Sequence, residues 1–228
     1  MAEALLIPYN LSIRITTDGF SFTLEQNNDT ILKRHVYCSE SMLHEKLVEE
    51  FQQQNLLGKH FQQTSVIVHS KSQLVPNELY RPEDKLTWFT SLHPTQRPQE
   101  LVLMSQHIPE FGCHNIFSVP PKLYNTLQDA FGENIVYQHG NSLLIQTLLK
   151  KKDKHIAIYQ HHNRIDMVVM YNGQLLLSNQ FATQNETDIA YWVLNAIEQF
   201  KLPATLKTIE VQPENTSGLN NLLQKLLS

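Results

Sequence analysis

Apolar and polar residues alternate along residues 11–24, on either side of the pair Asp18 and Gly19. Alternation with a period of two is typical of a half-buried β-strand. An Asp-Gly pair between two such runs is the strongest short-range signal of a hairpin, and a type I′ turn requires positive φ at both central residues. We therefore predict two strands joined by a tight turn in which Asp18 and Gly19 both take positive φ. A second such turn is predicted at Asn172 and Gly173.

A series of five elements is predicted twice along the chain. Over residues 11–70 the pattern indicates three strands, a helix at about residues 41–57 that ends at Gly58, and a further strand. Over residues 155–212 it again indicates three strands, a helix and a strand. In this second copy the helix begins at a T-x-x-E capping box over residues 183–186. One series that occurs twice in the same order indicates an internal repeat.

The register between the two copies is predicted from their apolar positions. The strands are matched at an offset of 143 residues and the helices at an offset of 146. The matched pairs are Ile13 with Ile156, Leu43 with Ile189, and Val66 with Ile209. At the strand offset, the counterparts of Asp18 and Gly19 in the first turn are His161 and His162.

Residues 69–150 separate the two copies and are predicted to hold further helices and strands. The run KKKDK at residues 150–154 closes a helix that begins at Asn141, and positive side chains suit the negative end of a helix. We interpret the run as a solvated helix end, because a nucleic-acid-binding patch needs several basic clusters on one face. The predicted domains are residues 1–152, with the additional α/β elements, and the shorter residues 153–228.

Composition narrows the class of protein. The 228 residues are 41% hydrophobic and 18% charged with a formal net charge of -4, which is typical of a soluble globular protein and argues against a nucleic-acid partner. We expect neither a signal peptide nor a membrane-spanning helix, which needs an apolar run of about 20 residues. We therefore predict a cytoplasmic location without membrane contact. Cys38 and Cys113 have no paired-motif spacing and are predicted to be reduced thiols.

A βββαβ unit that occurs twice, with additional α/β elements after its first copy, resembles the actin-like ATPase superfamily. The segments SVIVHSKSQLVPNELY, VPPKLYNTLQDAFGENIVYQHGNSLLIQTLLK and HIAIYQHHNRIDMVVMYNGQLLLSNQF are similar to an uncharacterised bacterial family of that fold. The resemblance implies an α/β protein, in α+β layers, made of two ribonuclease-H-like subdomains with mixed sheets flanked by helices. In the superfamily these two subdomains face each other across a cleft. The resemblance implies no specific chemistry.

Active members of the superfamily hold ATP phosphates in two glycine-containing turns, because backbone N–H groups must approach phosphate without a Cβ in the way. The cleft-facing turn candidates in this chain are Thr17, Asp18, Gly19, His161 and His162. Hairpin chemistry accounts for Asp18 and Gly19, whose direct adjacency departs from the pattern of active members. The second turn, QHHNR, has neither a glycine nor a carboxylate. We therefore predict a degenerate nucleotide site without catalytic residues and without a bound cofactor.

Other chemistries receive less support from the sequence. Ribonuclease-H catalysis needs carboxylates that begin on the first strand, and neither LSIRI nor HIAIY contains one. His161 and His162 are adjacent on a turn, so their side chains diverge and are interpreted as surface or capping groups rather than as metal ligands. Cys113 and His114 are neighbours on a strand and point to opposite faces, so no nucleophilic cysteine and no metal are predicted.

We predict a non-catalytic cytoplasmic protein of actin-like fold that acts through protein–protein contacts, as an adaptor or an assembly component. The expected partner is another protein or a second copy of the chain. After the segment SGLNNLLQKLLS the second copy does not continue with the strands that extend the first. Its sheet is therefore expected to keep an open edge or an uncovered apolar face, and such edges are usually covered, paired or used to bind a partner. The alternative is an enzyme or sensor that binds a nucleotide or small ligand in the interdomain cleft.

Overall fold

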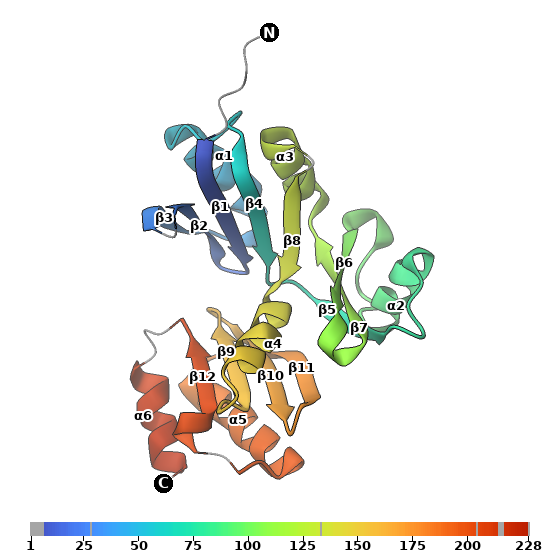
Figure 1. The fold of residues 1–228 in the computed structure, drawn as a ribbon, viewed down its shortest axis with the longest axis vertical. Coiled ribbons are helices and arrows are strands. Elements are labelled where there is room, and N and C mark those ends of the chain that lie inside the picture. Colours follow the sequence, from blue (N-terminus) through green and yellow to red (C-terminus); the bar gives the residue numbers. More distant parts are fainter. Residues whose placement is uncertain (1–6, 28, 133, 204, 214–216, 228) are drawn as a thin grey trace. The chain divides into compact units, whose positions relative to one another are not determined.

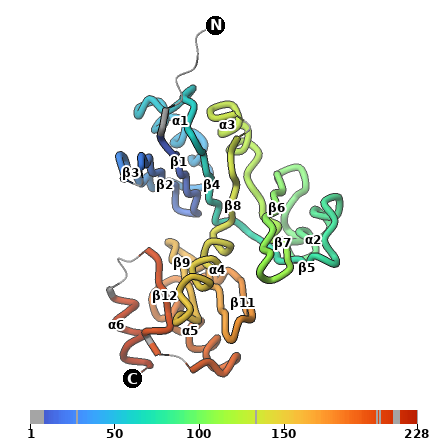
Figure 2. The backbone as a smooth tube through the Cα atoms, in the orientation of Figure 1, coloured from blue at the N-terminus to red at the C-terminus, as the bar shows by residue number. Residues whose placement is uncertain are grey.

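The computed structural model describes residues 7–27, 29–132, 134–203, 205–213 and 217–227, and it has the α/β class that the sequence predicts (Figure 1). The chain forms two compact units, which the tube in Figure 2 traces from end to end. The first unit contains residues 1–107 and 114–139, and the second contains residues 108–113 and 140–228. None of the helices in the described ranges combines the length and apolar character that crossing a membrane requires.

The first unit is built on a five-stranded mixed sheet in the order β3-β2-β1-β4-β8. The strands are β1 (Ile7–Thr16), β2 (Gly19–Gln26), β3 (Asp29–Tyr37), β4 (Phe61–Val68) and β8 (Ile135–His139). Alternate residues of β1 and β2 pack in one core with α1 (Leu43–Gln53) and α3 (Pro121–Phe131), in which Phe51 meets Phe22 edge-on. Burial of this apolar face is the main stabilising contribution to the unit.

The helix α1 is shorter than the sequence pattern predicts, and Gly58 does not follow it directly. Asn55 takes the left-handed conformation at φ 52, and the N–H groups of Asn55 and Leu56 bond to the carbonyls of Gln52 and Phe51. This pattern is a Schellman motif with asparagine in the position that glycine usually takes. The prediction that the helix runs to residue 57 is therefore wrong.

A small sheet in the order β5-β7-β6 completes the elements between β4 and β8. Its strands are β5 (Ser72–Pro76), β6 (Val102–Ile108) and β7 (Cys113–Val119), accompanied by α2 (Lys85–Leu92). The short 3-10 helices of the chain are η1 (Glu40–Met42), η2 (Pro82–Asp84), η3 (Pro98–Glu100), η4 (Pro109–Phe111) and η5 (Leu206–Thr208). Phe89 of α2 packs with Val75 and Ile116 in a separate small core.

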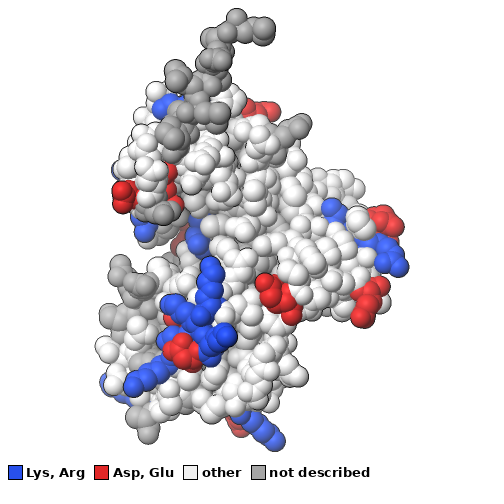
Figure 3. Space-filling view, in the orientation of Figure 1, with Lys and Arg blue, Asp and Glu red and all other residues white. Residues whose placement is uncertain are grey.

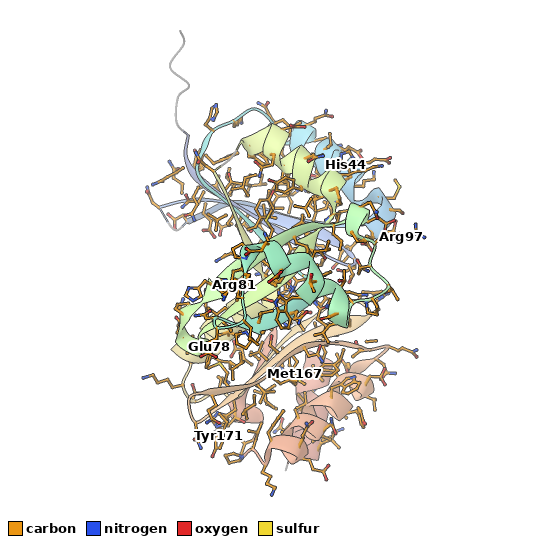
Figure 4. The ribbon with its side chains drawn as sticks, turned by 90° about the vertical axis from the view of Figure 1, so that its right-hand side faces the viewer. His44, Glu78, Arg81, Arg97, Met167 and Tyr171 are labelled. Atoms are coloured by element: carbon orange, nitrogen blue, oxygen red, sulfur yellow. The ribbon has the colours of Figure 1, made fainter. Side chains whose placement is uncertain are left out.

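The second unit is built on a four-stranded sheet in the order β11-β10-β9-β12. The strands are β9 (Ile156–Gln160), β10 (Arg164–Tyr171), β11 (Gln174–Ala182) and β12 (Ile209–Gln212). One face packs against α5 (Glu186–Phe200) and α6 (Ser217–Leu226), and α4 (Gly140–Lys150) contacts β9 and β10. Met167 of β10 belongs to the apolar core with α5, and Tyr171 packs at the margin of that core (Figure 4).

Two local predictions for the second unit have different outcomes. Asn172 and Gly173 both have positive φ between paired β10 and β11, which confirms that turn. The capping box over residues 183–186 is wrong, because the side chain of Asn185 is the cap and accepts hydrogen bonds from the N–H groups of Thr187 and Asp188. Asparagine is as good a cap as threonine, and it lies one residue before the first helical position.

Tyr137 of β8 provides a test of the first core at high pH. Burial raises the pKa of its phenol from 10 to about 12, so the folded state holds this proton more tightly than the unfolded state does. The resulting stability is present below pH 10 and is lost as the pH rises toward 12. We expect wild type to lose stability relative to Tyr137→Phe over that range in urea-denaturation series. Parallel pH profiles of the two proteins would contradict this expectation.

Candidate functional site

The first hairpin turn does not have the geometry that the sequence suggests. Thr16 pairs with Gly19, so Thr17 and Asp18 are the two loop residues. Within this turn only Gly19 has positive φ, at 139, and the prediction of positive φ at Asp18 is therefore wrong. The hydroxyl of Thr16 donates to the carbonyl of Gly19 at 3.1 Å, and this bond closes the turn.

Gly19 is required by the neighbouring strand β3. A Cβ atom at this position would lie 2.0 Å from the carbonyl oxygen of Val36, which is much closer than non-bonded atoms approach. The φ of 139 also belongs to a region that only glycine readily occupies. Close packing of β2 against β3 is thus sufficient to explain the glycine that first suggested a phosphate site.

Hydrogen bonds correct the predicted register between the two turns. In the first turn Thr16 pairs with Gly19. The corresponding pair in the second turn is His161 with Arg164, in which the N–H of His161 donates to the carbonyl of Arg164 at 2.9 Å. Likewise, the bond from Cys38 N–H to the Asp18 carbonyl corresponds to the bond from Thr183 N–H to the Asn163 carbonyl. These pairs of positions are related by an offset of 145 residues rather than 143. The counterparts of Asp18 and Gly19 are therefore Asn163 and Arg164.

His161 is buried, which contradicts its interpretation as a surface group. Its Nε2 lies 3.1 Å from Oδ2 of Asp166, and both side chains are fully buried. The other carboxylate oxygen, Oδ1, accepts a hydrogen bond from Nε2 of Gln180 at 2.8 Å. His162 is exposed, as predicted. We call His161, Asp166 and Gln180 the Asp166 cluster.

The Asp166 cluster occupies the face of the second sheet that is opposite the apolar core. Ile165 and Met167 belong to that core, so Asp166 between them points to the other face. Further along β10, Val168 pairs with Ser178. The hydroxyl of Ser178 accepts a hydrogen bond from the amide of Asn141 on α4 at 3.1 Å. This face of the sheet is therefore partly polar, although α4 lies against it.

The chemistry available to the Asp166 cluster follows from its bonds. A carboxylate beside Nε2 fixes the orientation of an imidazole. The cluster offers one imidazole and one carboxylate as atoms of metal-ligand type, and these already bond to each other. Sequence inspection missed Asp166, and the signal that could have found it is a single acid inside the otherwise apolar run IDMVVM.

Buried histidines also occur in the first unit. Nε2 of His69 lies 2.8 Å from a guanidinium nitrogen of Arg14, and Nε2 of His139 lies 2.8 Å from the carbonyl oxygen of Ser70. The histidines that are close in sequence, His107 and His114, stack with ring centroids 4.8 Å apart. These contacts give the histidines packing and hydrogen-bonding roles within the unit.

The most accessible part of the first sheet is its edge strand β3. The strand has nine residues, all of them exposed or half-buried, and among the residues that the structure describes no other strand pairs with its outer side. Ile31 is 53% exposed and Tyr37 is 77% exposed. Long exposed edges are uncommon, because their unpaired backbone groups recruit other strands.

The hydrogen bond from Cys38 N–H to the Asp18 carbonyl shows which backbone groups of β3 face outward. Asp18 and Cys38 form a hydrogen-bonded pair, and such pairs alternate with non-bonded pairs along an antiparallel ladder. The next pair, Gly19 with Tyr37, is therefore a non-bonded pair, and so are the later pairs that contain His35 and Lys33. The N–H and C=O groups of Lys33, His35 and Tyr37 therefore point to the open edge.

The side chains of these three residues share one exposed face. The neighbouring Arg34 points to the other face, where its guanidinium lies 3.7 Å from Glu50 of α1. The rings of His35 and Tyr37 are in contact, with centroids 4.2 Å apart. The edge thus presents a row of backbone donors and acceptors beside one amine, one imidazole and one phenol.

The second sheet also ends at an open strand. β12 pairs with β9 on one side, and within the described residues it has no strand on its other side. In the first sheet the corresponding strand β4 continues to β8. An open edge of the second sheet is what the sequence predicts.

Comparison with known proteins agrees with this architecture. Residues 6–214 match the model of a family described as "Protein of unknown function (DUF3822)". A crystal structure of a protein with actin-like ATPase fold and unknown function, from Bacteroides thetaiotaomicron VPI-5482, is 23% identical with a TM-score of 0.78. The alignment covers 96% of this chain and 88% of that chain. No curated protein sequence matches the chain.

A second solved structure, the PilM-PilN type IV pilus biogenesis complex, contains a chain of similar fold. It is 11% identical with a TM-score of 0.54, and the alignment covers 96% of this chain and 85% of that chain. Identities this low establish the fold without establishing the function. The chain therefore has the actin-like ATPase fold that its sequence resembles.

Proposed function

The chain belongs to the family described as "Protein of unknown function (DUF3822)", and we propose that it is a non-catalytic adaptor or assembly component that binds a partner protein. The observation that carries the proposal is the open edge of β3. An extended segment of the partner adds to this edge as a further strand. Main-chain hydrogen bonds would supply affinity, and side chains at alternate positions would supply specificity.

The chemistry of the edge defines the segment that it fits. Lys33 and His35 lie on the exposed face beside Tyr37, so carboxylates at alternate positions of the partner strand complement them. The similar fold in the PilM-PilN complex supports the proposal, because that protein is found in an assembly. The proposal includes a cytoplasmic location, since the free thiols of Cys38 and Cys113 suit a reducing compartment.

A proline substitution tests the edge directly. Because the N–H group of His35 points outward, His35→Pro removes a donor from the open edge without removing a bond to β2, and proline is tolerated at such positions. We expect His35→Pro to reduce recovery of a co-purifying partner at least about tenfold, since loss of one strand-pairing bond also displaces its neighbours. Quantitative mass spectrometry of material purified from native lysate measures this recovery.

The matched control is His35→Ala, which changes the side chain and keeps the backbone donor. It is expected to retain the partner that His35→Pro loses. Recovery of the same partner by the proline variant, or a chain that runs alone under every condition, would contradict the proposal.

The alternative of a nucleotide enzyme or sensor is tested by thermal melting with Mg-ATP, Mg-ADP and other nucleotides. We expect no shift, because packing against β3 accounts for Gly19 and the second turn has Arg164 at the corresponding position. A ligand at 100 times its Kd would stabilise the protein by about 2.7 kcal/mol. A shift of that size would favour the sensor.

A further inference from the structure

Four lysines lie within residues 150–154 at the end of α4, and the backbone of a fifth, Lys207, lies beside them. The last residue of α4 is Lys150, and the chain that follows folds back so that Nζ of Lys154 donates to the carbonyl of Lys207 in η5 at 2.8 Å. We call Lys150, Lys151, Lys152, Lys154 and Lys207 the lysine patch. Figure 3 shows basic side chains gathered on this unit around a few acidic ones.

Glu210 of β12 forms ion pairs with two lysines of the patch. Its carboxylate lies 2.6 Å from Nζ of Lys151 and 3.9 Å from Nζ of Lys154, and Lys154 also donates to the carbonyl of Ile209. Two of the five lysines are thereby fixed. The other three, Lys150, Lys152 and Lys207, are exposed, and in the described part of the chain no ion pair engages them.

The charge of the patch is opposite to that of the rest of the molecule. Its five lysines, with the acids Asp153 and Glu210, have a formal charge of +3, whereas the whole chain has -4, which leaves -7 for the remainder. A surface of one sign on a protein of the other sign attracts an oppositely charged partner and orients it during approach. A solvated helix end needs only Lys150, so helix electrostatics do not account for a cluster that includes Lys207.

We infer that the lysine patch binds an acidic segment of a partner protein. This inference rests on the proposed function and adds a second contact surface with a defined chemistry. All five cations are lysines, which attract carboxylates as point charges. The formal net charge of -4 over the whole chain opposes a nucleic acid, whose phosphates would also meet the acidic remainder of the molecule. Lys151 and Lys154, which are paired with Glu210, lie beside three lysines that are exposed.

The test uses a fluorescein-labelled 12-residue peptide of aspartate and glutamate, with binding measured by fluorescence anisotropy at two salt concentrations. We expect binding to wild type that weakens as salt increases. The double variant Lys150→Glu with Lys152→Glu is expected to bind at least about tenfold more weakly. Lys150→Gln with Lys152→Gln, which perturbs the helix end less, is expected to weaken binding in the same direction by a smaller factor.

The control variant Lys59→Glu with Lys122→Glu changes the net charge equally at sites outside the patch, and it is expected to bind as wild type does. Equal binding by all variants, absence of binding, or tighter patch-dependent binding of a single-stranded oligonucleotide than of the peptide would overturn the inference. His35→Pro is measured in parallel. If His35→Pro still binds the peptide and also still recovers the cellular partner, the proposed role of the β3 edge is rejected. The inference about the lysine patch then stands.

Discussion

Replacing Asp166 with alanine is expected to lower the free energy of unfolding of the second unit by about 3–5 kcal/mol. The carboxylate is fully buried and accepts hydrogen bonds from both His161 and Gln180. Its removal takes this acceptor away from the buried His161 and the half-buried Gln180 and leaves a small void, and both changes destabilise the folded state. Urea denaturation followed by Trp192 fluorescence in a Trp88→Phe background measures the effect, because Trp192 lies in this unit.

Two control experiments distinguish the stability that the buried network contributes from the effect of removing any negative charge. Asp153→Ala removes an exposed acid of the same unit and is expected to change stability by less than about 0.5 kcal/mol. A double-mutant cycle between Asp166→Ala and His161→Ala is expected to give a coupling of about 0.5–3 kcal/mol, as is usual for groups in contact. A cost for Asp166→Ala no larger than that for Asp153→Ala would show that the network contributes little.

Gly19→Ala is expected to destabilise the first unit by about 3 kcal/mol or more. The added methyl would lie 2.0 Å from the carbonyl oxygen of Val36, and the residue would have to keep φ at 139. Neither strain can be relieved without moving β2 away from β3, because the nearest atom belongs to the backbone. Urea denaturation followed by Trp88 fluorescence in a Trp192→Phe background reports on this unit.

The matched control for Gly19 is Gly58→Ala. Gly58 also has positive φ, at 71, but no atom lies within 4 Å of a Cβ built there. The expected cost is only that of the left-handed backbone, about 1 kcal/mol. Similar losses at both positions would mean that β3 does not restrict Gly19.

The two predicted hairpin turns show how well residues that are adjacent in the sequence predict the position of a turn. Asn172 and Gly173 form the turn that their residue types favour, and a Cβ built at Gly173 would meet no atom within 4 Å. Asp18 and Gly19 carry an equally strong local signal, yet the loop lies one residue earlier. The difference arises because Gly19 must pass close to Val36 of β3, and that neighbour is 17 residues away in the sequence.

The predicted site residues show the same limit. An alternating apolar pattern is unchanged by a shift of two residues, so the sequence could not distinguish an offset of 143 from one of 145. That shift placed His161 and His162 where Asn163 and Arg164 belong. It also concealed the contact of His161 with Asp166, which depends on the sheet bringing two positions of a hairpin together.

Hydrophobic periodicity, which depends only on neighbouring residues and on which face of an element is buried, determined the α/β class of the protein and the order of most of its strands and helices. The resemblance of that order to the actin-like ATPase superfamily then indicated the fold. The tertiary structure alone decided which histidine is buried against a carboxylate, why Gly19 is a glycine, which backbone groups of β3 remain open, and that Lys207 joins the lysines after α4. Each of these features depends on atoms that are not neighbours along the chain, and their distances are set only when strands pair and sheets and helices pack.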